Sequence, residues 1–148
     1  GPLGTWRGGR EKAPAAICRK VATAKITGEH YVDIWGNGMQ RRSFMWVGDN
    51  VDGIVRLLQT SHEPVNLGSE NGITINDLVD TVETIAFGRT GVLRRDYIPH
   101  APRGVASRNS DNTYLRQVTG GWEPSTPLQV GLEKTYAWIY DQLQKEIN

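Results

Sequence analysis

Three short polar segments combine basic side chains with other hydrogen-bonding groups, and such segments could bind an anion. They are 10–12 (Arg-Glu-Lys), 40–42 (Gln-Arg-Arg) and 108–112 (Arg-Asn-Ser-Asp-Asn). Arginine forms bidentate hydrogen bonds with phosphates, and the first segment precedes a predicted helix N-terminus, where backbone N–H groups favour negative charge. If the fold brings the segments together, they would suit a pyrophosphate joined to a sugar. The alternative is three unrelated solvated loops.

The sequence holds none of the common motifs for a dinucleotide, a nucleoside triphosphate or a serine nucleophile. Gly36-Asn37-Gly38 lacks the third glycine of a Gly-x-Gly-x-x-Gly loop, and neither a P-loop nor a Gly-x-Ser-x-Gly turn occurs. The three histidines are far apart. Cys18, the single cysteine, lies within a predicted helix, where a thiol is usually an apolar filler. We therefore expect no metal site and no internal disulfide.

Composition limits the class of protein. The 148 residues fit one domain over 1–148, and 38% hydrophobic with 22% charged residues excludes a wholly disordered chain. A net charge of +1 provides no field that would hold nucleic acid. No apolar run approaches the roughly 20 residues of a membrane span, and no signal-peptide pattern opens the chain. We therefore expect neither a nucleic-acid nor a membrane partner, and a cytoplasmic location.

The segments that must position these side chains alternate between helical and strand-like patterns. Helices are predicted at about 14–24, from a cap at Asp49, from Thr74 to Gly88, at about 113–118 and from a cap at Thr126. Strands are predicted at 31–35, 42–47, 64–68 and 92–98. This alternation predicts an α/β fold, or α+β for the chain taken alone.

Apolar periodicity gives two of these helices a clear face. The helix after Asp49 carries Val51, Ile54, Val55 and Leu58, whose spacing is typical of an amphipathic helix that packs on a core. Along the last helix the corresponding stripe consists of Leu128, Leu132, Tyr136, Ile139, Leu143 and Ile147. Thr74 and Asp77 have the spacing of a capping box at the start of a third helix.

Uncommon short sequence motifs occur along the whole chain. They are GPLGTW at 1–6, GGREKAPAA at 8–16, CRK at 18–20, IWG at 34–36, Gln40 with RSF at 42–44, EPVN at 63–66 with GS at 68–69, RNSDN at 108–112, GW at 121–122 and WI at 138–139. Together they resemble the GDP-mannose 3,5-epimerase family, within the extended short-chain dehydrogenase/reductase superfamily. The resemblance also implies that GPLG at 1–4 is native sequence and not the remnant of a cleaved tag.

The resemblance implies the substrate-binding, C-terminal part of an NAD-dependent nucleotide-sugar epimerase. Family members oxidise the hexose at C4, invert C3 and C5 by enolisation, and return the hydride. Because the C4 ketone acidifies the neighbouring protons, the reaction needs an acid–base pair. The family pair is a lysine and a cysteine, and the lysine corresponds to Lys12. Cys18 corresponds to a different family cysteine and is not expected to take part.

The resemblance also implies a set of contacts to a GDP-mannose-like substrate. They fall on Glu11, Ala13, Lys20, Gln40, Arg41, Arg42 and Arg108. Lys20 and Arg108 would suit the diphosphate or the guanosine end. Arg41 stands where the family usually has threonine, so that the choice of sugar nucleotide remains open at this point.

The resemblance places the glycine-rich NAD loop, the Tyr-x-x-x-Lys pair and the reactive cysteine before residue 1. We therefore expect that the chain holds no main NAD site and is catalytically incomplete alone. We expect it to pair with a complementing N-terminal chain or with further copies of itself. A strand at 65–67 without its sheet would expose N–H and C=O groups that can pair with another chain. The alternative is a non-catalytic binding or interaction module that reuses the fold.

Overall fold

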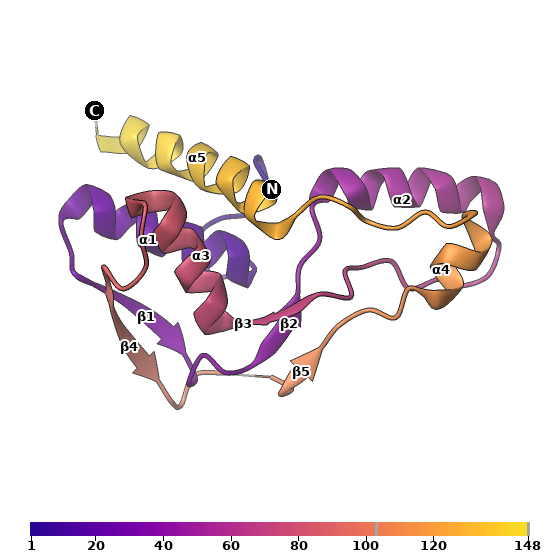
Figure 1. Cartoon of the computed structure of the whole chain (residues 1–148). Helices are drawn as coiled ribbons and strands as arrows, with labels where there is room; N and C mark the ends of the chain where they lie inside the picture. The colour runs from indigo at the N-terminus through magenta and orange to yellow at the C-terminus, as the bar shows by residue number, and fades with distance from the viewer. Residues whose placement is uncertain (103, 148) are drawn as a thin grey trace.

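The computed structural model describes residues 1–102 and 104–147. The helices are α1 (Ala13–Thr27), α2 (Val47–Thr60), α3 (Ile75–Phe87), α4 (Thr113–Val118) and α5 (Leu128–Ile147). The strands are β1 (Tyr31–Trp35), β2 (Arg41–Ser43), β3 (Gly72–Thr74), β4 (Arg94–Ile98) and β5 (Ser107–Arg108). In Figure 1, α1, α3 and α5 gather near β1 and β4, whereas α2 and α4 stand on the other side of β2, β3 and β5. The predicted α/β class is confirmed.

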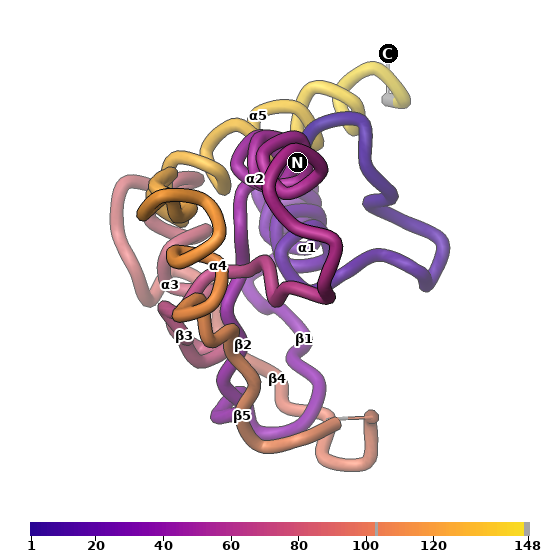
Figure 2. Tube along the Cα trace, turned by 90° about the vertical axis from the view of Figure 1, so that its right-hand side faces the viewer, coloured from indigo at the N-terminus to yellow at the C-terminus, as the bar shows by residue number. Residues whose placement is uncertain are grey.

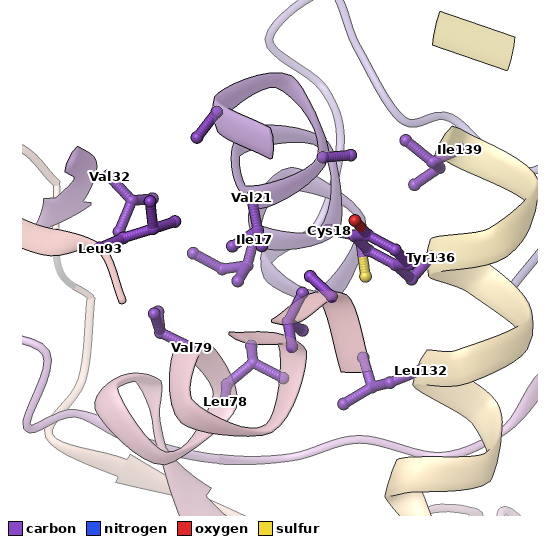
Figure 3. Packing of buried hydrophobic residues seen from close by; sticks show 14 of the residues in the cluster. Ile17, Cys18, Val21, Val32, Leu78, Val79, Leu93, Leu132, Tyr136 and Ile139 are labelled. Atoms are coloured by element: carbon purple, nitrogen blue, oxygen red, sulfur yellow. The ribbon is translucent and has the colours of Figure 1, made fainter. Parts of the chain in front are cut away.

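The main core lies between α1, α3, α5 and β1. Fully buried side chains come from each helix, among them Cys18 on α1, Leu78 on α3 and Ile139 on α5 (Figure 3). Successive strand residues point to opposite faces, and β1 accordingly turns Val32 and Ile34 into this core. Burial of each large aliphatic side chain stabilises the fold by about 1.5–3 kcal/mol.

No helix in the described part of the chain has the length and apolar composition needed to cross a bilayer.

The three-stranded sheet brings two distant basic segments together. Its order is β3-β2-β5, with β2 antiparallel to β3 and parallel to β5. The register places Arg42 opposite Arg108. Neighbouring strands lie about 4.8 Å apart, so these two arginines become neighbours. The sequence pattern predicted neither β3 nor β5, because strands of two or three residues are too short to show periodicity.

Several predicted elements are confirmed, including α1, β1, β4 and α4. The capping box of α3 is also confirmed. The Thr74 hydroxyl accepts a hydrogen bond from the Asp77 backbone N–H, and the Asp77 carboxylate accepts one from the Thr74 N–H, both at 3.0 Å. The helix ends at Gly88, whose φ of 76° lies in the left-handed region that favours glycine.

The caps predicted at Asp49 and Thr126 are wrong. α2 begins at Val47, so the predicted extended segment 42–47 ends before that residue, and α5 begins at Leu128. The two polar residues instead bind each other. The Asp49 carboxylate accepts hydrogen bonds from the backbone N–H and the hydroxyl of Thr126, both at 2.8 Å. A long-range contact has therefore taken the groups that local capping would have used.

The strand predicted at 64–68 is not formed. This segment has no regular secondary structure, because no strand of the described chain offers it the N–H and C=O partners that a ladder requires. Leu67 instead packs against α2 at Gly53. A Cβ atom at Gly53 would lie 2.6 Å from Leu67 and 2.8 Å from Trp122. Glycine at this position therefore permits the close approach of α2 to the segment.

The apolar face of α2 is exposed, which differs from the burial that its spacing suggests. Val51, Ile54, Val55 and Leu58, which we call the α2 face, are 56%, 46%, 50% and 77% exposed. The buried residue of this helix is Gly53. Figure 1 shows this helix at the right-hand end of the molecule, and Figure 2, in which that end faces the viewer, looks nearly along its axis. Contiguous exposed apolar side chains of this kind mark an interaction surface.

Cys18 is expected to resist thiol reagents while the protein is folded. Its side chain is fully buried, and burial raises the pKa of the Cys18 thiol to about 12. The nucleophilic thiolate is therefore rare at neutral pH. Ellman's reagent should label Cys18 slowly in buffer and rapidly in urea. Equally fast labelling in both conditions would contradict the burial of this helix face.

Candidate functional site

A central hollow lies beside the paired strands β2 and β5. It has a volume of about 290 Å³ and is lined by Arg42, Ser43, Asn66, Leu67, Arg108, Asn109 and Ser110. The structure thus brings together two of the three predicted polar segments, 40–42 and 108–112. Two guanidinium groups accompanied by hydroxyl and amide groups can bind an anion through charge-assisted hydrogen bonds.

A second hollow, of about 300 Å³, lies where α1 meets β1 and β2; we call it the strand-end hollow. Five of the predicted substrate contacts line it, namely Glu11, Ala13, Lys20, Gln40 and Arg42. Because Arg42 also lines the central hollow, the two hollows adjoin. The first polar segment therefore joins the second here, through a different hollow from the third.

Lys12 lies in a third hollow, of about 280 Å³, which we call the Lys12 hollow. Aromatic side chains such as Phe44 and Trp46 form part of its wall. Lys12 occupies the N-cap position of α1, where its side chain makes no capping hydrogen bond. Ser43 lines both this hollow and the central one. Lys12 is thus placed next to, and not within, the hollow that holds the two arginines.

Arg41 lines none of these three hollows. Its guanidinium donates a hydrogen bond to the carbonyl of Gly72 on β3, whereas that of Arg42 donates to the carbonyl of Val105 at 2.7 Å, on the β5 side. The two neighbouring arginines therefore bind opposite edges of β2. The contact between Arg41 and a substrate stays a prediction that this geometry does not support.

Ion pairs join α1 to its surroundings in the strand-end hollow. Glu11 accepts a hydrogen bond from Arg19 at 2.8 Å, and the Lys20 ammonium donates to the Asp33 carboxylate at 2.7 Å and to the Asp33 carbonyl at 3.0 Å. Hydrogen bonds from its own backbone N–H and from Arg19 hold the pKa of Glu11 below its usual value. The Lys20 side chain is 18% exposed and that of Asp33 is 39% exposed. The Asp33 carboxylate is thus partly open to a ligand.

Sequence reasoning did not select Asp33, Trp35 or Asn66 as site residues. Asp33 and Trp35 line the strand-end hollow, and Asn66 lines the central hollow. The Trp35 side chain is 51% exposed at the end of β1. A large aromatic residue directly before the Gly36 turn was the available signal. Beside it, the Gln40 amide donates to the Trp35 carbonyl at 3.0 Å, while its Oε1 atom is buried without a hydrogen-bond partner among the described residues.

Asn112 fixes the wall of the central hollow. This residue is only 2% exposed. Its side chain donates to the Gly68 carbonyl at 2.8 Å and accepts from the Ser110 hydroxyl at 2.7 Å, and its backbone N–H donates to Glu70 at 2.8 Å. Buried polar groups that are satisfied in this way hold a site in one geometry. The polar side of the hollow is therefore preorganised by contacts between distant segments.

No group of three or more His, Cys, Asp or Glu side chains that could hold a metal ion occurs among residues 1–102 and 104–147. Near the central hollow, acidic groups are paired with arginine. Glu70, for example, accepts a hydrogen bond from Arg116 at 3.1 Å. The site is thus built from hydrogen-bond donors and ion pairs.

The sequence is similar to that of known nucleotide-sugar enzymes. Residues 1–68 match the family described as "NAD dependent epimerase/dehydratase family". Over 147 residues, 99% of this chain, the sequence is 42% identical to GDP-mannose 3,5-epimerase 1 from Oryza sativa subsp. japonica and to GDP-mannose 3,5-epimerase from Arabidopsis thaliana. These alignments cover 36% and 37% of the two relatives, so the chain spans just over a third of their length.

The fold is similar to parts of solved structures. UDP-glucose 4-epimerase from Thermotoga maritima, determined with UDP-glucose, superposes with a TM-score of 0.81 at 26% identity, covering 97% of this chain and 43% of that one. A GDP-L-fucose synthetase from Naegleria fowleri also gives a TM-score of 0.81, over 97% of this chain and 44% of that one. At 17% identity the second likeness concerns the fold alone.

Proposed function

We propose that this chain, whose sequence is similar to those of the GDP-mannose 3,5-epimerases, forms the nucleotide-sugar-binding part of such an epimerase. One observation carries the proposal. The register of β2 and β5 sets Arg42 opposite Arg108 at the central hollow. Paired guanidinium groups match the two phosphates of a nucleoside diphosphate sugar.

The residues around the Lys12 hollow support a place for the hexose. This hollow adjoins the central one at Ser43, so a sugar attached to a diphosphate between the arginines would extend toward Lys12. An ammonium group there can deliver a proton to a carbon next to a ketone. Lys12 is therefore the proposed acid–base residue of this chain.

The residues that the structure describes do not fit an NAD site by themselves. The helices that directly follow short strands, α2 and α3, begin at Val47 and Ile75 without a glycine-rich turn, although such a turn is what allows a pyrophosphate to approach a helix N-terminus. We therefore derive no redox step from these residues. The isolated chain is expected to bind nucleotide sugar but not to epimerise it.

The α2 face is the proposed contact for the complementing part. A dinucleotide-binding half, on the same polypeptide or on another, would cover Val51, Ile54, Val55 and Leu58, and it would offer a strand to segment 64–68, which joins neither of the sheets in the described chain. This segment also supplies Asn66 and Leu67 to the central hollow. Docking there would consequently place the partner beside the bound diphosphate.

The proposed compartment of the protein is the cytoplasm, which cell fractionation would check.

Arg108→Ala is expected to lower the affinity for GDP-mannose about 10- to 100-fold, because it removes charge-assisted hydrogen bonds to phosphate worth about 1.5–3 kcal/mol. Isothermal titration calorimetry measures the effect. Arg89→Ala, an exposed arginine at the end of α3, is the matched control and should bind like the wild type. If wild-type chain binds no nucleotide sugar at all, the proposal fails, and the non-catalytic interaction module becomes the better description.

A further inference from the structure

The segment that carries Lys12 has no regular structure of its own. Residues 1–12 precede α1 without forming a helix or a strand, and Figure 2 shows part of them, in indigo, as a loop that projects from the side of the molecule. Gly8 and Gly9 have φ values of 91° and 83°. A Cβ atom added at either glycine would meet no heavy atom within 4 Å beyond its neighbours in the chain. The position of this loop therefore depends on a few side-chain contacts.

Arg19 and Glu11 tie the loop to α1. Side chains of a helix lean toward its N-terminus, and Arg19, about two turns along the chain from Glu11, accordingly reaches back to the loop. The Arg19 guanidinium donates to the Trp6 carbonyl at 3.1 Å and to one Glu11 carboxylate oxygen at 2.8 Å. The other Glu11 oxygen accepts from the Gly9 N–H at 2.7 Å. Three points of the loop are thus joined to one helix.

The Arg19–Glu11 pair has the properties of a firm link. The Glu11 side chain is only 8% exposed and that of Arg19 is 30% exposed. Hydrogen bonds from its own backbone N–H and from Arg19 hold the pKa of Glu11 below its usual value, so the carboxylate is ionised at neutral pH. Charge-assisted hydrogen bonds of this kind are among the stronger polar contacts in proteins.

We infer that Arg19 is a positioning residue for Lys12 and acts by holding Glu11, the residue directly before it; this inference rests on the proposed function. The Lys12 carbonyl accepts a hydrogen bond from the Ala16 N–H at 3.0 Å, in the first turn of α1. The Lys12 backbone is therefore held by the helix on one side and by the Glu11 link on the other. A misplacement of about 1 Å can slow a reaction on the order of 100-fold, so a proton donor needs such support.

A purely structural role of the ion pair makes different predictions. A residue that acts through Lys12 matters only while Lys12 is present and only for a ligand that has a hexose. A residue that only stabilises α1 would affect GDP-mannose and GDP alike, and its effect would add to that of Lys12→Ala. Arg19 also lines the strand-end hollow, and a direct contact with the ligand there would likewise weaken GDP.

The experiment is calorimetry of the full chain with GDP-mannose and GDP. Lys12→Ala and Arg19→Ala are each expected to weaken GDP-mannose binding about tenfold, while GDP binding stays within about threefold of the wild type. The double variant should bind GDP-mannose no more weakly than Lys12→Ala, because both residues act on one contact. Arg19→Lys should restore only part of the affinity, since an ammonium does not match the planar fork that serves both acceptors. Arg56→Ala, which removes an exposed ion pair with Asp52 on α2, is the matched control.

Limited proteolysis with trypsin measures the link without any ligand. Cleavage after Arg7 or Arg10, both exposed in the loop, should be about tenfold faster in Arg19→Ala than in the wild type or in Arg56→Ala, because the loop opens more often. Circular dichroism shows whether Arg19→Ala keeps its fold. If it does not, Glu11→Gln replaces it and should lower the preference for GDP-mannose over GDP in the same way.

Four results would overturn the inference: Arg19→Ala weakens GDP-mannose and GDP equally, it changes neither, its full effect adds to that of Lys12→Ala, or it leaves the rate of loop cleavage unchanged. In each case the Arg19–Glu11 pair is no more than a structural link, and the proposed function stands as long as the wild type binds GDP-mannose. A wild-type chain that binds neither ligand would instead overturn the proposed function, and the inference with it.

Discussion

Replacing Glu83 with alanine is expected to lower the free energy of unfolding by about 3–5 kcal/mol. The Glu83 carboxylate is fully buried. It accepts hydrogen bonds from the backbone N–H groups of Leu93 at 2.7 Å and Gly91 at 3.1 Å, and it lies 3.5 Å from the Arg95 guanidinium. Its removal would leave buried donors unsatisfied and would separate α3 from the start of β4, because no other group replaces these contacts.

Urea denaturation followed by circular dichroism measures this effect. Glu83→Gln should lose less, because one amide oxygen still accepts from Leu93, although its NH₂ group cannot accept from Gly91. Glu133→Ala changes an exposed glutamate on α5 and should stay within about 0.5 kcal/mol of the wild type. A Glu83→Ala variant as stable as Glu133→Ala would show that the buried carboxylate does not anchor the 91–93 segment.

Combining Val51→Asp with Leu58→Asp is expected to weaken self-association of the chain about 100-fold or more. In the absence of the complementing half, two copies would cover each other's α2 face. Burial of one large apolar side chain is worth about 1.5–3 kcal/mol, and about 1.4 kcal/mol changes an equilibrium constant tenfold. Two charged substitutions at the centre of such an interface therefore have a large effect on the dissociation constant.

Analytical ultracentrifugation over a wide concentration range measures the association. Both positions are exposed in the single chain, so the helix itself should fold normally in the double variant. Leu3→Asp changes an apolar side chain that is 87% exposed in the N-terminal loop and should associate like the wild type. A wild-type chain that stays monomeric at the highest concentrations would contradict self-association through α2.

The sequence predicted the features of this fold that depend on neighbouring residues. The capping box of Thr74 and Asp77, the glycine stop at Gly88 and the strand at 31–35 all follow from local hydrogen bonding, backbone freedom or alternation of buried side chains. The caps at Asp49 and Thr126 were wrong because each of these residues found a partner 77 positions away in the sequence.

The candidate site was predictable only in part, for a related reason. The family motifs and the chemistry of arginine predicted Lys20, Gln40, Arg42 and Arg108 as site residues. The hollow in which each of them lies depends on strand pairing, which the sequence did not show. Asp33 carried no signal, and Asn66 belonged to the EPVN motif but was not selected as a site residue, since a single carboxylate or amide in a short strand or loop is usually solvated. Their placement beside basic groups appears only when α1 packs on β1 and when the 64–68 segment meets the loop before α4.

By itself, the sequence determined the resemblance to nucleotide-sugar epimerases, the approximate places of the helices and the set of polar side chains available for a phosphorylated ligand. The tertiary structure alone decided that Arg42 lies opposite Arg108, that Arg41 turns to the other edge of β2 and that the α2 face is exposed. The physical reason is the range of the interactions. Caps and apolar stripes are determined within one or two turns of chain, whereas strand register and the burial of a helix face depend on which distant segment, or which other chain, supplies the opposing surface.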